Sequence, residues 1–422
     1  MSKPQHPFRI ANFRAYWVSR FAGTIAQNAM ALIIAYQVYN IARETMDVRE
    51  ASFLLGMIGL AQFVPLLLLT PVVGLVADSV DRRWIVRSTT ALLILNAATL
   101  GVLTWTGALT LPVLFGAAVL IGIARAFSGP AYSALAPNLV PREVLPTSIA
   151  VSSIAWQVGT IIGPSIGGVL LSISPNAAYA GAVALFAVAL SCIFLIGPVP
   201  QPPVQKDHRP LARIVEGFGY VKRNRLVQAT ITLDLFAVLL AGSTALLPVF
   251  ARDILQVGPD GLGVLAAASG IGAAAMAIWF SFRPMKENVG VKMLWAVVAF
   301  GIATVVFGLS TYFWLSVAAL VVAGAMDMVS VYVRSSLIQL HTPDAMRGRV
   351  SAVSQLTISA SNELGEAESG LLASILGPVG AVVLGGAGAI GVTLLWARLY
   401  PELRLAKTFD APDKPAHATL GA

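Results

Sequence analysis

Residues 176–197 read NAAYAGAVALFAVALSCIFLIG, a stretch without a charged side chain, and stretches of this kind decide the fold. An apolar run of roughly 18 or more residues is long enough to cross a hydrocarbon layer of about 30 Å as a helix. Over the whole chain 57% of the residues are hydrophobic and only 11% are charged. A soluble domain usually carries about 25% charge. The sequence therefore predicts an all-α membrane protein.

Similar apolar runs recur along the 422 residues, which leave room for about twelve helices and for no separate soluble domain. The predicted spans are 16–40, 52–77, 84–106, 111–135, 146–172, 176–197, 226–250, 261–281, 293–310, 313–338, 348–375 and 378–398. A proline-rich, hydrophilic stretch interrupts them near the middle of the chain. We therefore predict an N-terminal six-helix bundle (1–197), a cytoplasmic linker with an amphipathic helix (198–225), a C-terminal six-helix bundle (226–400) and a cytoplasmic tail (401–422).

The positive charges indicate the orientation, because Lys and Arg collect on the cytoplasmic side of membrane proteins. If the N-terminus is inside, all but six of the 28 Lys and Arg residues fall in cytoplasmic segments. Three of the six are then outside, and the other three lie within spans. The six are Arg43, Arg49 and Arg252 outside, and Arg20, Arg125 and Arg334 within spans. We predict that both termini are cytoplasmic.

An internal repeat relates the two halves of the chain. Shifting the sequence by 202 residues aligns 150–152 (Ala-Val-Ser) with 352–354 (Ala-Val-Ser), and it aligns Gly163 with Gly365 and Gly168 with Gly370. The second half is therefore a parallel copy of the first. Parallel copies place a substrate path between the halves near the middle of the bilayer, so the repeat predicts a transporter.

The segment 74–83, GLVADSVDRR, is predicted to connect the second and third spans on the cytoplasmic side. It resembles the signature loop of the major facilitator superfamily, Gly-x-x-x-Asp-x-x-Gly-Arg-Arg/Lys, with Asp81 where the family usually has glycine. Arg82 and Arg83 can bridge to the C-terminal ends of helices. The resemblance implies the twelve-helix major facilitator fold and a conformational latch made of Gly74, Asp78, Arg82 and Arg83. The alternative is an ordinary positively charged loop.

The fifth predicted span carries a glycine-rich pattern. Its residues are Gly159, Gly163, Pro164, Gly167 and Gly168. Small residues four apart let helices touch backbone to backbone, and an internal proline bends the helix. The pattern resembles the antiporter motif of exporters in this superfamily, which implies export. Helix packing without a functional role is the alternative.

Arg125 lies in the middle of the fourth predicted span, where a charge costs on the order of 3 kcal/mol and needs a partner or a cavity. It resembles the fourth-helix arginine that drug:proton antiporters use in proton coupling, although Ser128 replaces the usual glutamine. The alternative is a structural ion pair. Arg20, Gln27, Asn28 and Gln157 are the polar candidates for the lining of the cavity.

The second half carries the buried acids. The candidates for proton coupling, with Arg125, are Asp234, Asp327, Arg334, Glu363 and Glu366. Glu363 and Glu366 share one helix face, whereas Glu368 points elsewhere. No histidine falls in a predicted span, so a carboxylate has to carry any proton. Salt bridges between the bundles are the simpler explanation, and the two explanations are compatible.

The resemblance covers nearly the whole chain and is greatest to the drug:proton antiporter-like branch that includes enterobactin exporters and macrolide-efflux proteins. It implies a proton-coupled exporter of small amphipathic molecules such as drugs or siderophores, which works by alternating access in the bacterial inner membrane. A lysophospholipid or lipid flippase on the same scaffold is the alternative. We expect a monomer in the lipid bilayer that uses the proton-motive force and has no cofactor, metal or nucleic-acid partner.

An enzyme is not expected, because the sequence lacks a His-Glu-x-x-His zinc site, a Ser/His pair in the spans and a nucleotide-binding Gly-x-x-x-x-Gly-Lys-Ser/Thr loop. Cys192 is the only cysteine, which excludes a disulfide framework within the chain.

Overall fold

The computed structural model describes residues 6–198 and 210–409. Eleven helices in this part are long and apolar enough to cross a membrane. The longest of them, α13 (Asp344–Leu399), contains two spans, because Gly377 adopts a left-handed φ of 79° and Pro378 follows it. The prediction of an all-α protein with twelve crossing segments is thereby confirmed for the described residues, whereas the cytoplasmic location of the termini stays a prediction.

The first half contains six long helices. They are α1 (Ala11–Ala42), α2 (Val48–Ser79), α3 (Arg82–Trp105), α4 (Leu111–Leu135), α5 (Leu145–Ile173) and α6 (Pro175–Phe194). Side chains cap several of them: Asp47 and Glu50 form a capping box at the start of α2, and Ser174 accepts from the backbone N–H of Ala177 at the start of α6. The segments that connect successive helices are short, so each helix runs antiparallel to the one before it.

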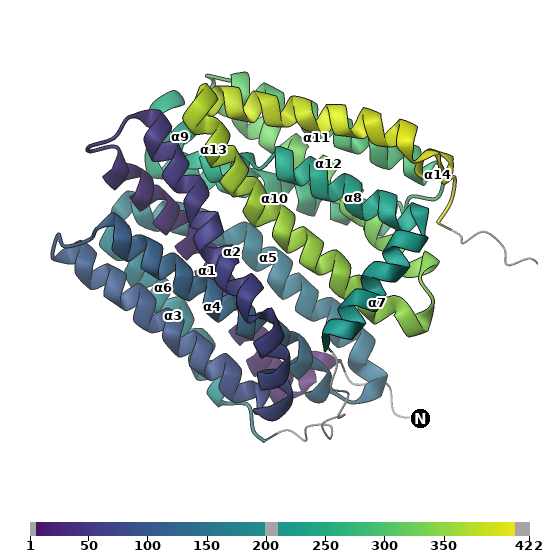
Figure 1. The fold of residues 1–422 in the computed structure, drawn as a ribbon. Coiled ribbons are helices and arrows are strands. Elements are labelled where there is room, and N and C mark those ends of the chain that lie inside the picture. Colours follow the sequence, from purple (N-terminus) through teal and green to yellow (C-terminus); the bar gives the residue numbers. More distant parts are fainter. Residues whose placement is uncertain (1–5, 199–209, 410–422) are drawn as a thin grey trace, which may run out of the picture.

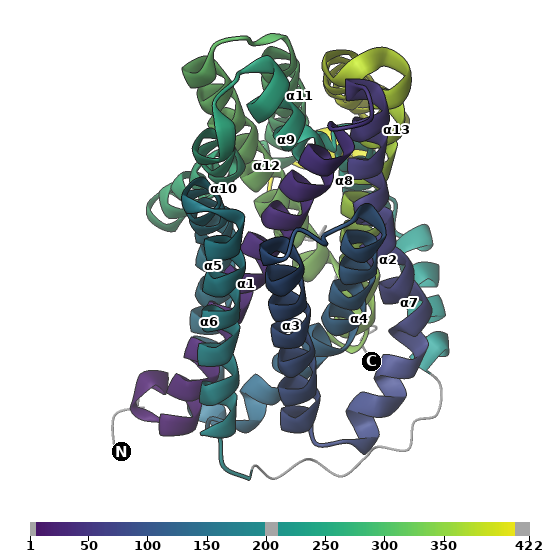
Figure 2. The ribbon, with the colours of Figure 1, turned by 90° about the vertical axis from the view of Figure 1, so that its left-hand side faces the viewer.

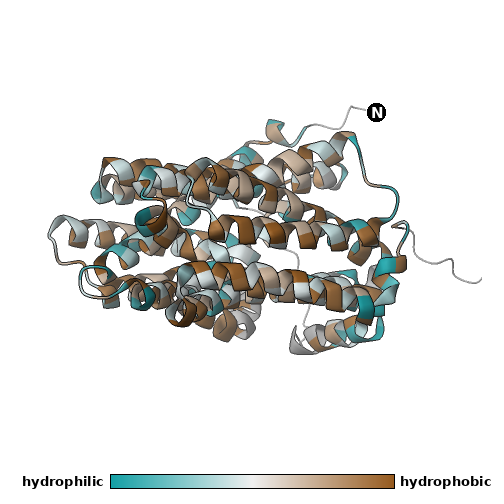
Figure 3. Cartoon of the chain, turned by 90° about the horizontal axis from the view of Figure 1, so that it is seen from above, coloured by the Kyte–Doolittle hydropathy of each residue, from teal (hydrophilic) through white to brown (hydrophobic). Residues whose placement is uncertain are grey.

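The second half follows a linker helix, α7 (Pro210–Arg223), which lies in the predicted linker. Its long helices are α8 (Arg225–Leu240), α10 (Gly258–Phe282), α11 (Val289–Leu309), α12 (Phe313–His341) and α13, and α14 (Pro401–Leu405) ends the described chain. Figures 1 and 2 show α1–α6 as one group and α8–α13 as the other, with α7 at the periphery. Hydrophilic residues gather at loops and helix ends, and hydrophobic residues occupy much of the helices between them (Figure 3).

The seventh span differs from its prediction as one helix over 226–250. It breaks after α8 and continues through a 3₁₀ turn (Ser243–Leu246), the short helix α9 (Leu247–Val249) and a π-helical turn (Phe250–Ile254). Gly242 sits directly against the backbone carbonyl of Gly365 at the break, a contact that leaves no space for a side chain. Pro248 cannot donate a backbone hydrogen bond. Close packing and proline together explain the interruption.

The hydrophobic cores show how the halves meet. We call the side of the molecule that carries α7 and the described chain ends the terminal side, and the other the far side. The largest core cluster joins both halves and lies toward the far side, with members such as Tyr39, Leu55, Phe250, Leu262 and Ala373. Three smaller clusters each belong to one half. In the described chain the halves therefore share a core toward the far side.

Candidate functional site

An ion pair between Arg125 of α4 and Glu363 of α13 connects the two halves near mid-membrane. Arg125 Nη1 donates to Glu363 Oε1 at 2.8 Å and to Gln62 Oε1 of α2 at 3.3 Å. The Glu363 side chain is only 8% exposed, whereas that of Arg125 is 40% exposed. The expectation that Arg125 faces a partner is met by Glu363. Gln62 was not predicted, since a lone glutamine in an apolar span gives no signal of its direction.

Glu366 lies one helical turn along α13 from Glu363 and also faces the first half. A Cβ built on Gly59 of α2 would lie 2.8 Å from Glu366 Oε2. One turn before Gly59 on α2, Gly56 lies against Gly370 of α13. The close packing of α2 on α13 thus sets a second carboxylate between the halves, as the shared face of the two glutamates predicted.

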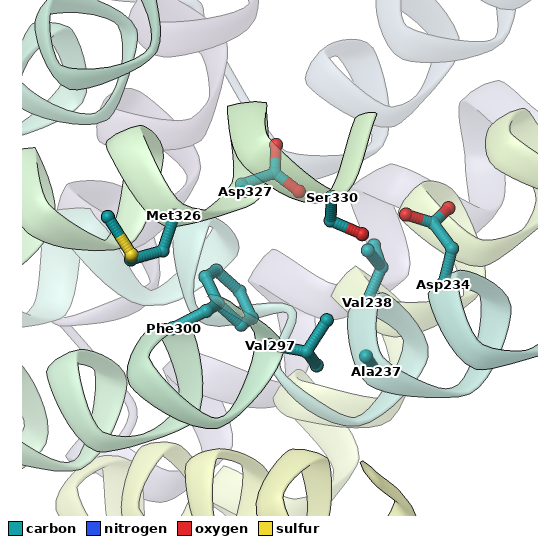
Figure 4. Close-up of a pocket in the computed structure, with 8 residues that line it drawn as sticks. All are labelled: Asp234, Ala237, Val238, Val297, Phe300, Met326, Asp327 and Ser330. Atoms are coloured by element: carbon teal, nitrogen blue, oxygen red, sulfur yellow. The ribbon is translucent and has the colours of Figure 1, made fainter. Parts of the chain in front are cut away.

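The acids Asp234 of α8 and Asp327 of α12 lie within the second half. Asp234 forms an ion pair with Arg334, and both side chains are 5% exposed. Both acids line one narrow cavity together with Ser330, whose buried hydroxyl has no hydrogen-bond partner in the described chain. Figure 4 shows that hydroxyl between the two carboxylates. The two acids are therefore not equivalent, because Arg334 already neutralises Asp234.

The glycines of the fifth span make two contacts. A Cβ on Gly159 or Gly163 would collide with Thr24 or Asn28 of α1, and Gly167 lies against Ala29. Gly168 instead lies against Gly263 of α10, in the other half. Pro164 lies inside the continuous helix α5. The pattern thus packs α5 on α1 within its half and on α10 across the halves.

The predicted latch is mainly helical. Its first residues form the last turns of α2, but the surroundings of Gly74 and of the Asp78 side chain are not described. Arg82 Nη1 donates to the carbonyl of Ala134 at 3.1 Å, and Arg83 Nη1 donates to the carbonyl of Ile196 at 3.2 Å. Ala134 lies in the last turn of α4 and Ile196 lies two residues past the end of α6, and cations are favourable at such helix C-termini. The two arginines thus fix the start of α3 against its neighbours.

Asp81 caps α3, which explains how the chain accommodates an aspartate where the superfamily usually has glycine. Its φ of −57° needs no glycine, and its side chain accepts from the backbone N–H of Arg83 at 2.9 Å. Hydrogen bonds from the Arg83 side chain also hold the pKa of Asp81 below its usual range. The aspartate therefore replaces the usual turn residue by capping the helix.

A polar cluster closes the far side and was not predicted as a site. Arg252 Nη1 donates to Asn40 Oδ1 at 2.6 Å, and Tyr39 donates to Asp253. Arg43 lies 3.4 Å from Asp253, whose hydrogen bond raises the pKa of the Arg43 guanidinium. These contacts join the end of α1 to the π-helical turn of the other half. The sequence signal was a charged pair directly after a span, which looks like an ordinary loop.

The polar candidates for the cavity lie on α1 and α5. Arg20 and Gln27 of α1 are partly exposed, and Gln157 of α5 is half-buried. Asn28 donates to the carbonyl of Thr24 at 2.8 Å and packs against Gly163, so it belongs to the helix interface. Gln27 and Gln157 form no hydrogen bond with the described residues. The structure therefore separates Arg20 and Gln27 from Asn28.

Comparison with known families gives one match across nearly the whole chain. The sequence model of the family described as "Transmembrane secretion effector" matches residues 2–416. The enterobactin exporter EntS of Citrobacter koseri is 27% identical over 401 residues, which cover 93% of this chain and 92% of that protein. EntS of Escherichia coli is equally similar, with the same identity and coverage.

Solved structures match in fold. A bacterial homologue of the human lysosomal transporter Spinster, in an inward-facing and occupied conformation, superposes with a TM-score of 0.72 at 14% identity. The match covers 95% of this chain and 99% of that one. A D-xylose–proton symporter matches with a TM-score of 0.68 at 12% identity, covering 92% and 98%. At these identities the likeness concerns the fold alone.

The relatives and the helices together define the location and class of the protein. The relatives are bacterial exporters by name, the matching family is one of transmembrane proteins, and the described residues include eleven helices able to cross a membrane. It is a multi-pass protein of the bacterial inner membrane. It is also a transporter and not an enzyme, as expected.

Proposed function

Because the chain belongs to the transmembrane secretion effector family of the major facilitator superfamily, we propose that it exports small siderophore-like amphipathic molecules in exchange for protons. The observation that supports this most is the ion pair between Arg125 and Glu363. It joins the two halves at the depth where parallel repeats enclose a substrate path. A bond at this place is broken or made whenever the halves move relative to each other.

Protonation of Glu363 supplies the link between proton movement and the change of conformation. In the described state the halves share their core toward the far side, and Glu363 is paired with Arg125 as a charged carboxylate. This is the state expected after a proton has left toward the terminal side. A proton arriving from the far side removes the charge of Glu363, and the attraction of Arg125 for it falls. The difference in free energy between the two conformations of the substrate-free protein then changes.

Asp327 and Glu366 provide further places for a proton. Asp327 lies beside the unpartnered hydroxyl of Ser330, in a cavity whose described lining contains no cationic side chain, and the nearby Arg334 is already paired with Asp234. Glu366 lies a turn from Glu363 on the same packed face. Like charges this close disfavour simultaneous ionisation. We propose that Glu363 and Glu366 share the coupling at the interface, with Asp327 as a station within the second half.

Two observations support export as the direction of transport: the names of the relatives and the glycine pattern of α5. The named relatives export enterobactin, and the glycines that resemble the exporter motif pack α5 against both halves. An exporter binds its substrate from the cytoplasm, which corresponds to the terminal side if the predicted orientation is right. The halves share their core toward the other side, as a state ready for loading requires.

The test is efflux of enterobactin from proteoliposomes that contain the purified full-length protein. An inward proton gradient is expected to accelerate efflux at least tenfold, and Glu363→Gln is expected to abolish that acceleration. Glu368→Gln on the same helix is the control, because Glu368 does not face Arg125, and it is expected to keep the gradient effect. Equal efflux with and without the gradient would refute proton coupling, and absence of enterobactin efflux under both conditions would refute the proposed substrate class.

A further inference from the structure

Three arginines lie deep within the spans, and they differ in how their charge is balanced. Arg125 pairs with Glu363, and Arg334 pairs with Asp234. Arg20 of α1 has no carboxylate partner among the described side chains. A guanidinium at this depth is unfavourable unless it meets water, a counter-charge or a ligand. Helix packing therefore does not explain why Arg20 carries a charge without a carboxylate partner.

Two tyrosines hold the Arg20 guanidinium from one side. Its Nη1 donates to Tyr16 Oη at 2.9 Å, and that hydroxyl donates in turn to the carbonyl of Tyr132 at 3.1 Å. The ring of Tyr132 lies 5.9 Å from Arg20 Cζ. Arginine carries five N–H donors, and the described contacts use only one of them. The others are free to bind an oxyanion in the two-pronged geometry that suits carboxylate, sulfonate or phosphate.

Neighbouring helices cover the stripe of α1 that carries Arg20 only in part: Thr24 on this stripe is buried against Gly159 of α5, whereas Arg20 is partly exposed. It recurs at helical spacing with Gln27 and Ala31, and these three positions are partly or fully exposed. On other sides of α1, Gly23 faces Ala189 of α6, and Ala29 packs against α5. Because a charge facing lipid tails is costly, a stripe that carries Arg20 and Gln27 is expected to face a path that water can reach.

The position along α1 places Arg20 before the closed part of the molecule. It lies about 14 Å from the start of the helix on the terminal side. The core that joins the halves begins further along α1, with Ala26. Trp17 and Phe21 stack on each other at 5.1 Å beside it and offer an apolar, aromatic surface. A cation next to aromatic rings suits a ligand that combines an acidic group with a flat apolar body.

We propose that Arg20 anchors the acidic group of the transported molecule, and that the substrate is therefore an anionic amphiphile. This inference rests on the proposed transport function and adds the charge of the substrate to it. The acidic group is either the carboxylate or catecholate of a siderophore-like molecule or the phosphate of a lysophospholipid. Tyr16 and Tyr132 position the guanidinium, and the remaining N–H groups bind the oxyanion.

A matched pair of fluorescent probes tests the inference without any proton gradient. Anilinonaphthalene sulfonate carries the acidic group, and phenylnaphthylamine has the same ring system without the sulfonate. Binding of each is measured to the full-length protein in nanodiscs, with empty nanodiscs subtracted. Arg20→Gln is expected to weaken binding of the sulfonate at least tenfold and to change binding of the neutral probe less than twofold. Arg20→Lys is expected to retain most of the sulfonate affinity.

Arg14→Gln is the control, because Arg14 is exposed on the same helix and bonds to the carbonyl of Phe8. It is expected to bind both probes normally. An equal loss of both probes in Arg20→Gln, or no loss of either, would overturn the inference. Displacement of the sulfonate probe by dihydroxybenzoate indicates a siderophore-like acid, and displacement by lysophosphatidylglycerol but not by zwitterionic lysophosphatidylcholine indicates a lipid phosphate.

Binding and coupling can fail separately. If the proton gradient has no effect on efflux but the sulfonate preference still depends on Arg20, the proton coupling is wrong and the anion site stands. If the gradient drives efflux while the sulfonate preference survives Arg20→Gln, the coupling stands and the anion site is wrong.

Discussion

The two halves carry the same helix contact with different chemistry. The repeat of 202 residues places Tyr132 of α4 and Arg334 of α12 at equivalent positions, and each faces the first helix of its own half. In the first half Arg20 of α1 lies over the Tyr132 ring. In the second half Asp234 of α8 pairs with Arg334. The second half thus neutralises Arg334 with its own Asp234. The first half has no carboxylate paired with Arg20 among the described residues, so Arg20 can bind another anionic group.

The interfaces between the halves have diverged less. Gly168 of α5 and Gly370 of α13 are also equivalent in the repeat, and each packs backbone to backbone against a glycine of the opposite half. Duplication therefore kept the surfaces at which the halves meet, while the buried charges diverged.

The charge difference between the halves predicts different costs for removing the charged side chain on the first helix of each half, Asp234 of α8 or Arg20 of α1. Asp234→Asn leaves the buried Arg334 without a counter-charge, and breaking such a pair costs about 3–5 kcal/mol of stability. Arg20→Gln removes a charge that has no carboxylate partner in the described chain, so we expect a change below about 1 kcal/mol. Thermal unfolding of both variants in the same detergent measures the difference. Equal losses of Tm would contradict the comparison.

The likeness of the interfaces predicts equal effects of equivalent glycine substitutions. Gly168→Val and Gly370→Val both place methyl groups against the backbone of the opposite half, at Gly263 and Gly56. Overpacking of this kind costs about 1–3 kcal/mol, and here only in the state closed at the far side. Both variants are therefore expected to shift the population toward the state open at the far side, about 5- to 150-fold.

Spin-label distances across the far side measure that shift. In a Cys192→Ser background, labels at the exposed positions Thr45 and Asp260 report the separation of the halves. Gly116→Val is the control, because no atom lies near a Cβ at that position. A shift in only one of the two variants would show that the interfaces have diverged as the charges have.

The polar cluster on the far side is expected to contribute less than the glycine contacts. Asp253→Asn weakens its bonds to the buried Tyr39 and to Arg43. Arg43 and Asp253 are partly exposed, so their ion pair is worth about 1 kcal/mol. The same two labels are expected to show a fewfold increase of the longer distance. Glu44→Gln removes an exposed charge nearby and serves as the control. An effect as large as that of Gly168→Val would mean that charge, and not packing, holds the far side closed.

The sequence predicted the elements well and their mutual rotation poorly. Hydrophobic length and the repeat are properties of single segments, so the twelve spans and the break before Pro378 follow from them. The cost of a buried charge correctly predicted that Arg125 meets a partner. The pairing of Asp234 with Arg334 could not be predicted, because it depends on how two helices rotate against each other. The same holds for Tyr39 and Asp253, which lie in different halves.

The smallest effect is expected at Asp81, which stands where the superfamily usually has glycine. The bonds from Arg83 lower the pKa of Asp81, so its charge stabilises the fold above the usual aspartate pKa of about 3.9. That contribution is lost as the pH falls through the lowered pKa. Asp81→Asn keeps a capping oxygen and removes only the charge, so we expect a loss of about 0.5 kcal/mol at pH 7. Unfolding curves should converge for the two proteins once the pH is below the lowered pKa of Asp81, and a difference that persists there would assign the effect to capping and not to the charge.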